Sequence, residues 1–351
     1  MDARVEVLPM RRTRHRSPLM TAWKSLSFQI GVLHFLIGCG VEIYIANFNK
    51  LVTETKATST MKYVPPTDRN KSTKPAANVL VDPVRELYET MTRDYLSSYI
   101  DKHGGRNYAN ASPFPHVVID NLFPQSILDA VAAEIPESDI TKRGCAKGAS
   151  MCFTTKTDNK KSQFTKEGDM GYHTRALFAF IKSSQFVHFL ERLSGISKIV
   201  PDPHFSGSGI HMTSPGGSLG VHADFNWNNK IEMTRRVNTF IYLNPDWPEA
   251  YGGHLELWSQ DMRSCVQRIL PKMGRFVVFS STDFSYHGHP EPLNVPKGRA
   301  RRSIAMYYYT RERPKEECVD GNCAKKSHGT LFQTPVGCEK CLEGTCNAVT
   351  Q

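Results

Sequence analysis

Two residues in the stretch VHADFNWN have the types and the spacing of metal ligands. His222 and Asp224 stand two positions apart, directly after the glycine-rich segment SPGGSLG, which is typical of a loop. In a strand, residues two apart point to the same face with Cα atoms about 7 Å apart, a distance that two ligands of one ion can span. Facial sites for non-haem Fe(II) use two histidines and one carboxylate. The pair therefore predicts part of a metal site whose third ligand comes from another strand.

The third ligand has several candidates. His254 lies in GGHLELW, where it could equally be an ordinary strand residue. His287 lies in FSYHGHP, at the end of the strongly β-forming run GRFVVFSS. In a barrel, the end of one strand can lie opposite the start of another at the barrel mouth, and side chains from both can then bind one ion. This arrangement favours His287 as the third ligand. His289 is its nearest rival. The other histidines of the β-rich region, about 200–313, are His204 and His211.

The region from about residue 200 has the pattern of a β-protein. Short apolar runs are separated by Pro, Gly and Asn: SGIHMT, VNTFIYL, HLELWS, SCVQRIL, GRFVVFSS and SIAMYYYT. Regularly spaced short strands of this kind predict an all-β sandwich or barrel.

Helical patterns precede these strands. The segment DPVRELYETMTRDYLSSYIDKHG, from residue 82, predicts one amphipathic helix that ends at Gly104-Gly105. FPHVVIDNLFPQSILDAVAAEIP predicts a short strand and then a helix over about 124–135, and GYHTRALFAFIKSSQFVHFLERLSGIS predicts two helices, the second ending at Gly195. Helices followed by strands indicate an α+β fold in which helices buttress a double-sheet barrel.

The N-terminus predicts a membrane anchor. Residues 1–27 are rich in arginine, and residues 28–48, FQIGVLHFLIGCGVEIYIANF, are mostly apolar over about the 20 residues that a spanning helix needs. Glu42 is costly in a bilayer, so a buried helix or an amphipathic targeting peptide are alternatives. The positive-inside tendency would leave the N-terminus in the cytosol and place the rest in the endoplasmic reticulum or Golgi lumen, as in a single-pass type II protein. Residues 49–80, rich in Lys, Thr, Ser and Pro, predict a flexible stem.

Composition and charge restrict the possible partners. The chain has 351 residues, 40% hydrophobic and 22% charged, as in a globular protein. Its net charge of +10 owes much to the N-terminal arginines. The charge is therefore interpreted as a terminal signal, and no nucleic-acid partner is expected. Asn70 and Asn110 begin N-glycosylation triplets, which are compatible with a lumen.

The C-terminal tail, residues 314–351, is rich in cysteine. With Cys39 of the predicted membrane segment set aside, eight cysteines remain, five in the tail and three before it: Cys318, Cys323, Cys338, Cys341, Cys346, Cys145, Cys152 and Cys265. A structural zinc site is one interpretation, because CxxC and two further cysteines can complete a tetrahedron. Disulfides are the other, and an oxidising lumen favours them.

The motifs taken together resemble the 2-oxoglutarate and Fe(II)-dependent dioxygenases of the prolyl 4-hydroxylase type. The resemblance rests on H222-A-D224, RRVNTFIYLNPDWPEAYGGHLELW, GRFVVFSSTDFSYHGHP and RARRSIAMYYYT. Their order is similar to that family's core, a double-stranded β-helix or jelly-roll, over about 200–313. FPHVVIDNLFPQSILDAVAAEIP is similar to the family's entry segment, so the resemblance extends over about 115–313, with 81–199 as a helical support region.

The resemblance implies roles for individual residues. His222, Asp224 and His287 would be the iron ligands. Arg301 would bind the far carboxylate of 2-oxoglutarate, with Ser303 on the same face as helper, whereas Arg302 points away and Arg299 is a further rival. Tyr242 would bind the same carboxylate, or be an ordinary core tyrosine. Three aromatic residues could form a substrate wall, with scaffold packing favoured for the last: Phe225, Trp227 and Trp258.

The implied activity is hydroxylation of a C–H bond with O2 and 2-oxoglutarate, releasing succinate and CO2, with ascorbate as a possible further cofactor. Prolyl residues of secretory-pathway polypeptides are the expected substrate, because the motifs resemble prolyl hydroxylases. Another amino acid, a glycan or a lipid is an alternative, since a shared fold does not determine the substrate. A non-catalytic β-helix that binds a partner is the competing class.

Overall fold

The computed structural model describes residues 82–135, 146–321, 323 and 328–336, and the backbone alone of two short strands, Cys338–Leu342 and Thr345–Ala348. The predicted basic terminus, membrane anchor and stem, residues 1–80, lie outside the described residues, as does Asn70. Within the described ranges, no helix combines the length and the apolar character that a membrane crossing requires.

The helices of the N-terminal half follow the predicted pattern with one correction. The expected single helix after Asp82 is two helices, α2 and α3, because Thr92 interrupts it and its side chain caps the second one by accepting from the backbone N–H of Tyr95. The second helix ends before Gly104, as predicted. The helices are α2 (Pro83–Thr90), α3 (Arg93–His103), α4 (Arg106–Ala109), α5 (Gln125–Glu134), α6 (Tyr172–Ile181) and α7 (Ser184–Ser194), with short 3-10 turns η1 (Glu167–Asp169), η2 (Glu249–Tyr251), η3 (Lys315–Glu317) and η4 (Val319–Gly321).

The strands form an antiparallel sheet in the order β1-β10-β7-β12-β5-β11-β8-β9. Five further strands pair at its sides: β13 and β3 with β5, β2 with β3, β4 with β12, and β6 with β7. The bounds are β1 (His116–Ile119), β2 (Met151–Thr154), β3 (Asp158–Phe164), β4 (Val200–Pro201), β5 (Gly209–Ala223), β6 (Trp227–Asn228), β7 (Met233–Tyr242), β8 (Leu255–Trp258), β9 (Cys265–Ile269), β10 (Phe276–Ser280), β11 (His287–His289), β12 (Arg301–Thr310) and β13 (Leu331–Phe332), with β14 (Cys338–Leu342) and β15 (Thr345–Ala348) forming a separate ribbon.

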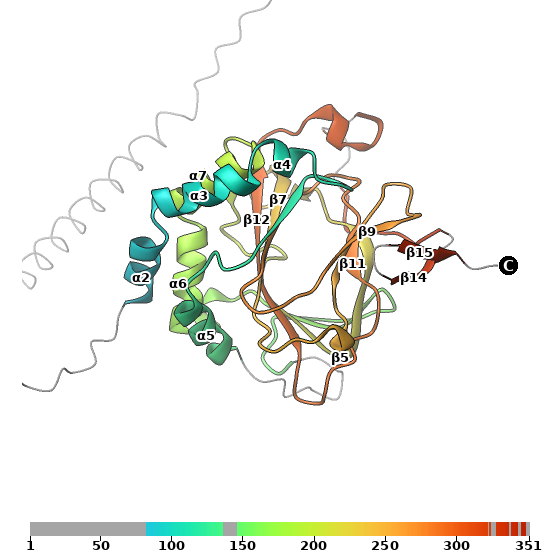
Figure 1. Ribbon diagram of the computed structural model, residues 1–351, viewed down its shortest axis with the longest axis horizontal. Helices are drawn as coiled ribbons and strands as arrows, with labels where there is room; N and C mark the ends of the chain where they lie inside the picture. The colour runs from blue at the N-terminus through green and yellow to red at the C-terminus, as the bar shows by residue number, and fades with distance from the viewer. Residues whose placement is uncertain are drawn as a thin grey trace, which may run out of the picture. The chain divides into compact units, whose positions relative to one another are not determined.

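The sheet curls so that β7 and β12 face β11 and β9, and the helices cover the outer side of β7 and β12 (Figure 1). The two faces of β12 show how this arrangement is encoded. Ile304, Met306 and Tyr308 belong to the core shared with the helices, whereas Ala305 and Tyr307 face the inside of the curl. Strand residues alternate in this way, so every second residue of β12 is available to a site between the sheets. A curled antiparallel sheet with helices on one side fits the predicted jelly-roll.

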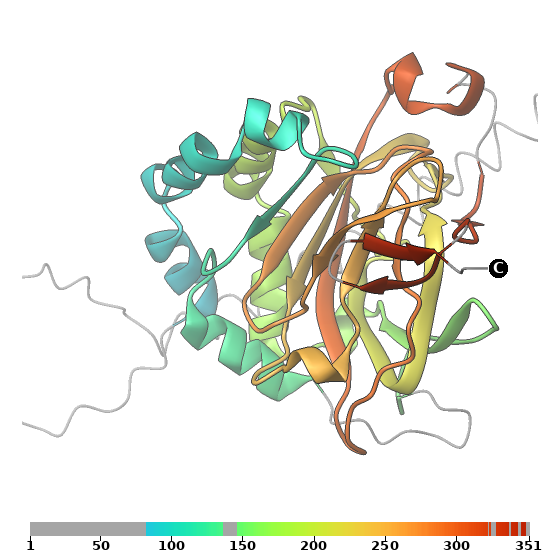
Figure 2. The same ribbon diagram turned by 45° about the vertical axis from the view of Figure 1, so that its right-hand side comes forward.

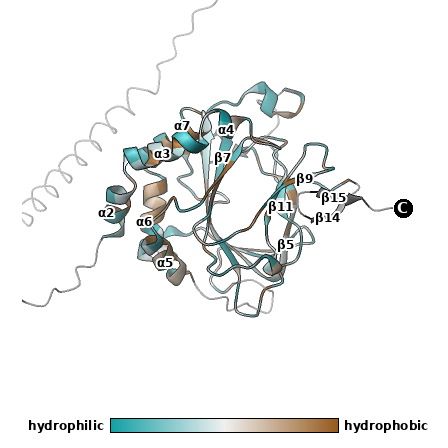
Figure 3. Ribbon diagram, in the orientation of Figure 1, coloured by the Kyte–Doolittle hydropathy of each residue, from teal (hydrophilic) through white to brown (hydrophobic). Residues whose placement is uncertain are grey.

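The core between helices and sheet is rich in aromatic residues. In Figure 3, α6 is among the most hydrophobic elements, and six of its residues are buried: Thr174, Ala176, Leu177, Phe178, Phe180 and Ile181. Phe186 of α7 contacts Phe276 of β10, with ring centroids 5.9 Å apart. This packing makes β10, β7 and β12 a rigid support for the side chains on their inner face.

Two sequence expectations need correction near the site. SPGGSLG is not a separate loop but part of β5, because its backbone pairs with β3 through Ser218 and Leu219. The region 81–199 is also not purely helical. It contains the hairpin β2–β3, whose polar sequence KTDNKKSQF has no apolar alternation that would indicate a strand.

The cysteine alternatives are partly resolved. Cys318 and Cys323 form a disulfide, and Cys152 and Cys265 are each disulfide-bonded as well. This pairing removes two of the five tail cysteines from any zinc site. The prediction of disulfides is therefore confirmed for Cys318 and Cys323. Figure 2 brings the β14–β15 ribbon, which contains the last three cysteines, to the front.

Candidate active site

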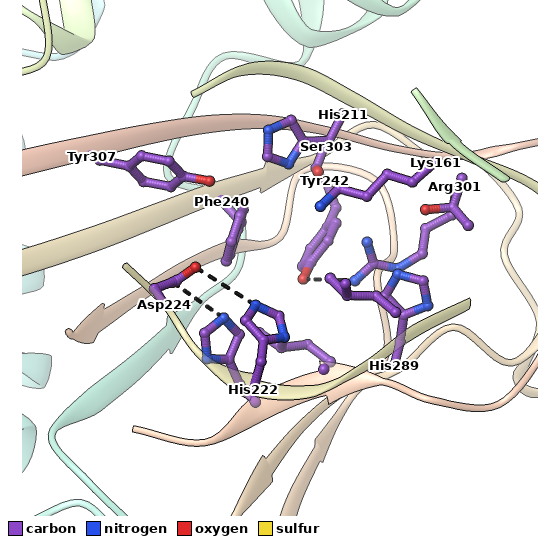
Figure 4. Close-up of a pocket in the computed structure, with 15 residues that line it drawn as sticks. Lys161, His211, His222, Asp224, Phe240, Tyr242, His289, Arg301, Ser303 and Tyr307 are labelled. Carbon is purple, nitrogen blue, oxygen red and sulfur yellow. Dashed lines mark hydrogen bonds and ion pairs between the residues drawn. The ribbon is translucent and has the colours of Figure 1, made fainter. Parts of the chain in front are cut away.

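His222 and His287 face each other across two neighbouring strands. They form a directly opposed pair of β5 and β11, and their ring centroids are 4.6 Å apart. His222 Nε2 lies 3.6 Å from Asp224 Oδ1, and His287 Nε2 lies 3.4 Å from Asp224 Oδ2 (Figure 4). One ligand atom from each residue lies within 4.8 Å of the others, and this is the one group with that property among the described residues.

The tautomers of both histidines suit metal ligation. His222 Nδ1 lies 2.8 Å from the carbonyl oxygen of Gly220, and His287 Nδ1 lies 2.9 Å from that of Ser285. A carbonyl oxygen can only accept, so each Nδ1 carries the proton and each Nε2 presents a lone pair toward Asp224. Burial, partly offset by Asp224, lowers the pKa of His287 to about 4, which keeps its imidazole neutral.

Glycine between His287 and His289 allows β11 to approach β5 closely. A Cβ at Gly288 would lie 2.8 Å from the backbone oxygens of Gly220 and Leu219. Any larger residue would push β11 away from the strand that carries His222. The glycine of the H-G-H motif is therefore part of the construction of the site.

Asp224 is held by two buried partners. Its Oδ2 accepts from Arg235 Nη2 at 2.9 Å and from Asn238 Nδ2 at 2.6 Å. These bonds leave Oδ1 as the oxygen for a metal ion. Burial alone would raise the pKa of Asp224, but Arg235 and the two histidines outweigh it, so the pKa of this carboxyl lies well below its ordinary value. The carboxylate is charged and oriented before any metal binds.

The opposite wall of the same pocket carries a cation. Arg301 Nε donates to the carbonyl oxygen of Gly253 at 2.7 Å, and Arg301 Nη2 donates to the hydroxyl of Tyr242 at 3.1 Å. Gly253 has φ +71, and a Cβ there would lie 2.5 Å from Leu293 and 3.0 Å from Arg301, so a side chain would displace the guanidinium. Ser303 lies opposite Tyr242 in the β12–β7 pairing, and all three side chains line the pocket.

The competing candidates lie elsewhere or point away. Arg302 donates to the carbonyl oxygen of Ala132 in α5, and Arg299 donates to that of Pro245. His254 is bonded to Glu249 outside the pocket, and His204 is exposed. His289 does line the pocket, on the side of Arg301, but is not part of the group around Asp224.

Lys161 is a site residue that the sequence did not suggest. It belongs to β3 and lines the pocket (Figure 4). Its Nζ forms an ion pair with Asp158, 3.5 Å from Oδ2. Burial and Lys161 together lower the pKa of the pocket residue His211 to about 3. Burial, Arg301 and Lys161 hold the pKa of His289 well below its ordinary value. The pocket therefore offers two fixed cations to an anionic ligand.

The three candidate aromatic residues have separate positions. Phe225 lines a wider cleft that opens next to His222 and Asp224, whereas Trp227 lines a different pocket beside Arg311 and Cys323. Trp258 is buried in the core at 2% exposure, and its packing role is confirmed. Only Phe225 is therefore placed to meet a substrate at the metal site.

The region that contains these residues matches a known family. Residues 208–309 match the family model described as the 2OG-Fe(II) oxygenase superfamily. That span includes both histidines, Asp224, Tyr242, Arg301 and Ser303, and it leaves out Lys161 and the tail. The resemblance stated from the motifs is confirmed over this span, which is a 2OG-Fe(II) oxygenase domain.

Several solved structures are similar to the chain. A prolyl-4-hydroxylase from Pseudomonas putida is 20% identical, with a TM-score of 0.39, covering 62% of this chain and 100% of its own. A prolyl hydroxylase from Trichoplax adhaerens, in complex with a hypoxia inducible factor peptide fragment, is 16% identical, with a TM-score of 0.36 and coverages of 65% and 90%. HygX from Streptomyces hygroscopicus, with nickel, 2-oxoglutarate and hygromycin B bound, is 11% identical, with a TM-score of 0.38 and coverages of 69% and 97%.

Through residues 208–309, the chain is thus an enzyme with a 2-oxoglutarate and Fe(II)-dependent oxygenase domain. Its cofactor is Fe(II), and its cosubstrates are 2-oxoglutarate and O2.

Proposed function

We propose that this chain holds Fe(II) through His222, Asp224 and His287 and uses it to hydroxylate prolyl residues of polypeptides. One observation carries the proposal. The three ligand atoms gather within 4.8 Å at one end of a pocket whose other wall carries Arg301. A dianion between them would reach the metal with one end and the guanidinium with the other.

Arg301, Tyr242 and Ser303 would hold the far carboxylate of 2-oxoglutarate. The guanidinium fork of Arg301 is fixed by Gly253 and Tyr242, so little side-chain freedom is lost on binding. Burial raises the pKa of Tyr242, partly offset by Arg301, which keeps its hydroxyl protonated and able to donate to a carboxylate. The charge of Lys161 adds to that of Arg301 on the same anion.

Iron and 2-oxoglutarate, when bound, supply the oxidising chemistry, in which O2 is consumed, 2-oxoglutarate becomes succinate and CO2, and one oxygen atom enters a C–H bond. The residues of this chain bind, orient and shelter these groups. Arg235 and Asn238 orient Asp224, and the side chains of Phe240, Tyr242 and Leu255 that line the pocket restrict water on the inner side. The open side faces the cleft lined by Phe225, where a substrate would enter.

The site assignment is tested by the weak charge-transfer absorption band that 2-oxoglutarate gives when it chelates Fe(II) without oxygen. We expect the band in a protein spanning residues 80–351 and its loss in His222→Ala and Asp224→Ala. His254→Gln, a buried histidine outside the pocket, is the matched control and should retain it. Absence of the band from the wild type, or its persistence in Asp224→Ala, would refute the site.

The substrate is tested separately. Synthetic proline-containing peptides, blocked at both ends, should stimulate succinate release and gain one oxygen atom in the mass spectrum. The same peptides with alanine in place of proline should not. If free amino acids, glycans or lipids were oxidised and the peptides were not, the proposed oxygenase activity would stand, but the proposed prolyl substrate would be wrong. A chain that binds peptide but releases no succinate would be a non-catalytic module.

We further propose that the enzyme is a type II membrane protein that faces the lumen of the endoplasmic reticulum or Golgi. The Cys318–Cys323 disulfide supports an oxidising compartment, and the apolar segment 28–48 would be the anchor. Protease added to intact microsomes should leave the C-terminal part undigested and should degrade it once detergent is present. Digestion in intact vesicles would contradict this topology.

A further inference from the structure

The C-terminal strap, residues 328–336, lies beside the strand that carries His222. Leu331 and Phe332 form β13, which pairs with Ala223 and His222 of β5. The backbone N–H of Gln333 donates to the carbonyl oxygen of Val221 at 2.8 Å, and that of Val336 to Met262 at 2.9 Å. The strap follows the end of the family match at residue 309, so the family pattern does not explain it.

The strap is anchored where it begins. His328 donates from its backbone N–H to Asn226 Oδ1 at 2.9 Å, and its Nε2 lies 3.0 Å from Asp283 Oδ1. Asp283 also accepts from Arg313 Nη1 at 2.8 Å, and the side chains of this pair are only 6% and 1% exposed. The Cys318–Cys323 disulfide lies shortly before the strap. The strap therefore has a defined position beside the site.

The ring of Phe332 contacts a candidate metal ligand. Its ring centroid lies 5.4 Å from that of His222, and Phe332 is 38% exposed. Met151, which lines the same cleft, is 46% exposed, and exposed apolar side chains that gather in this way mark interaction sites. Leu331, the neighbour of Phe332, is similarly exposed at 36%, but alternation turns it to the opposite side of the strand.

The cleft beside Phe332 is bounded on its other side by the hairpin β2–β3. Phe332 and Thr330 line the cleft together with Met151 and Phe153 of β2, and His222 and Asp224 line it as well. Among the described strands, β2 pairs only with β3, and β13 pairs only with β5. Each strand therefore turns an unpaired backbone edge outward, and such edges recognise extended peptides.

We propose that Phe332 is a specificity-determining residue, which packs against an apolar side chain of an extended polypeptide held between the strap and the β2–β3 hairpin. The inference rests on the proposed oxygenase function and adds the binding partner of that site. An extended polypeptide fits the two backbone edges, which a glycan or a lipid would not use. Aromatic packing on a partner also explains why the phenyl ring remains exposed beside a metal ligand.

The test uses a pool of random blocked 12-residue peptides and the full-length protein, loaded anaerobically with Fe(II) and 2-oxoglutarate. We expect the wild type to retain part of the pool and Phe332→Ala to retain roughly tenfold less, the typical cost of losing one aromatic contact. Leu331→Ala, a change of similar exposure on the other side of the strand, should retain as much as the wild type.

The charge-transfer band separates the possible failures. A purely structural role of Phe332, supporting the His222 ring, would weaken the band in Phe332→Ala, whereas loss of a substrate contact leaves the band intact. Equal retention by Phe332→Ala and wild type, or no retained peptide at all, would overturn the inference while the band still supports the oxygenase. Absence of the band from the wild type would instead reject the proposed function.

Discussion

Arg235 and Asp224 form a salt bridge in the interior, with 2.9 Å between Nη2 and Oδ2 and side-chain exposures of 1% and 11%. The guanidinium is held between two aromatic rings, with Cζ 3.3 Å from the ring centroid of Tyr307 and 4.6 Å from that of Phe225. Its Nε also donates to Asn238 Oδ1 at 2.6 Å. The carboxylate of the candidate metal site is therefore positioned by a rigid group that belongs to β7.

Removing this cation should weaken both metal binding and the fold. Arg235→Ala leaves a buried carboxylate without its partner, and breaking such a pair costs roughly 3–5 kcal/mol. A divalent metal would replace part of the lost positive charge. We therefore expect a larger loss of unfolding free energy in metal-free protein than in protein saturated with Mn(II), measured by urea denaturation. Arg235→Lys should keep the positive charge but no longer orient the carboxylate of Asp224. We expect its metal affinity to be reduced by about 10–100-fold. Equal destabilisation with and without metal would contradict this role.

The H-G-H motif offers a direct comparison of two histidines. We expect His287→Ala to reduce Mn(II) affinity by more than the approximately 10–100-fold that loss of an outer-shell partner costs, because it removes a ligand. His289→Gln should bind Mn(II) as tightly as the wild type, since His289 is not part of the group around Asp224. Electron paramagnetic resonance of the free ion measures both affinities. If His289→Gln reduced the Mn(II) affinity more than His287→Ala, His289 and not His287 would be the third metal ligand.

Adjacent arginines on opposite faces of β12 test the cosubstrate site. Arg301→Gln should raise the dissociation constant of 2-oxoglutarate by roughly 10–150-fold, the range expected for one hydrogen bond to a charged group. Arg302→Gln should leave it unchanged, because Arg302 points to α5 and donates to Ala132. Anaerobic calorimetric titration of the iron-loaded protein with 2-oxoglutarate gives both values. Similar losses in the two variants would remove Arg301 from its proposed role.

The anchor of the strap should depend on pH. Burial and Arg313 lower the pKa of His328, but hydrogen bonds to Asp283 and to the carbonyl oxygen of Gly329 outweigh them, so the pKa lies above its ordinary value. A raised pKa in the folded state stabilises the protein below the unfolded value of about 6.5, and this contribution disappears as the pH rises through the folded value. His328→Gln keeps a hydrogen-bond donor but does not titrate. The melting temperature of the wild type should therefore exceed that of His328→Gln at about pH 6 and converge with it in mildly alkaline buffer. A constant difference would exclude titration of this pair.

Much of the fold follows from local patterns in the sequence. Alternation and turn residues predicted β7, β8, β9, β10 and β12, and helical periodicity predicted α5, α6 and α7. The break between α2 and α3 was missed because Thr92 is an acceptable helix residue, and its role as a cap depends on how the chain turns there. The hairpin β2–β3 was missed because its residues are polar and its pairing partner, β5, lies about fifty positions later.

The sequence by itself determined which chemistry is possible. Two residues at strand spacing supplied a histidine and a carboxylate, a glycine lay between two further histidines, and alternation separated Arg301 from Arg302. Tertiary structure decided which of these groups meet. The pairing of β5 with β11 places His287 opposite His222. The strand β3 and the strap, which lie outside the recognised motifs, place Lys161 and Phe332 beside the same site. The physical reason is that strand pairing is a contact between distant segments, and its register depends on the whole sheet and not on any local pattern.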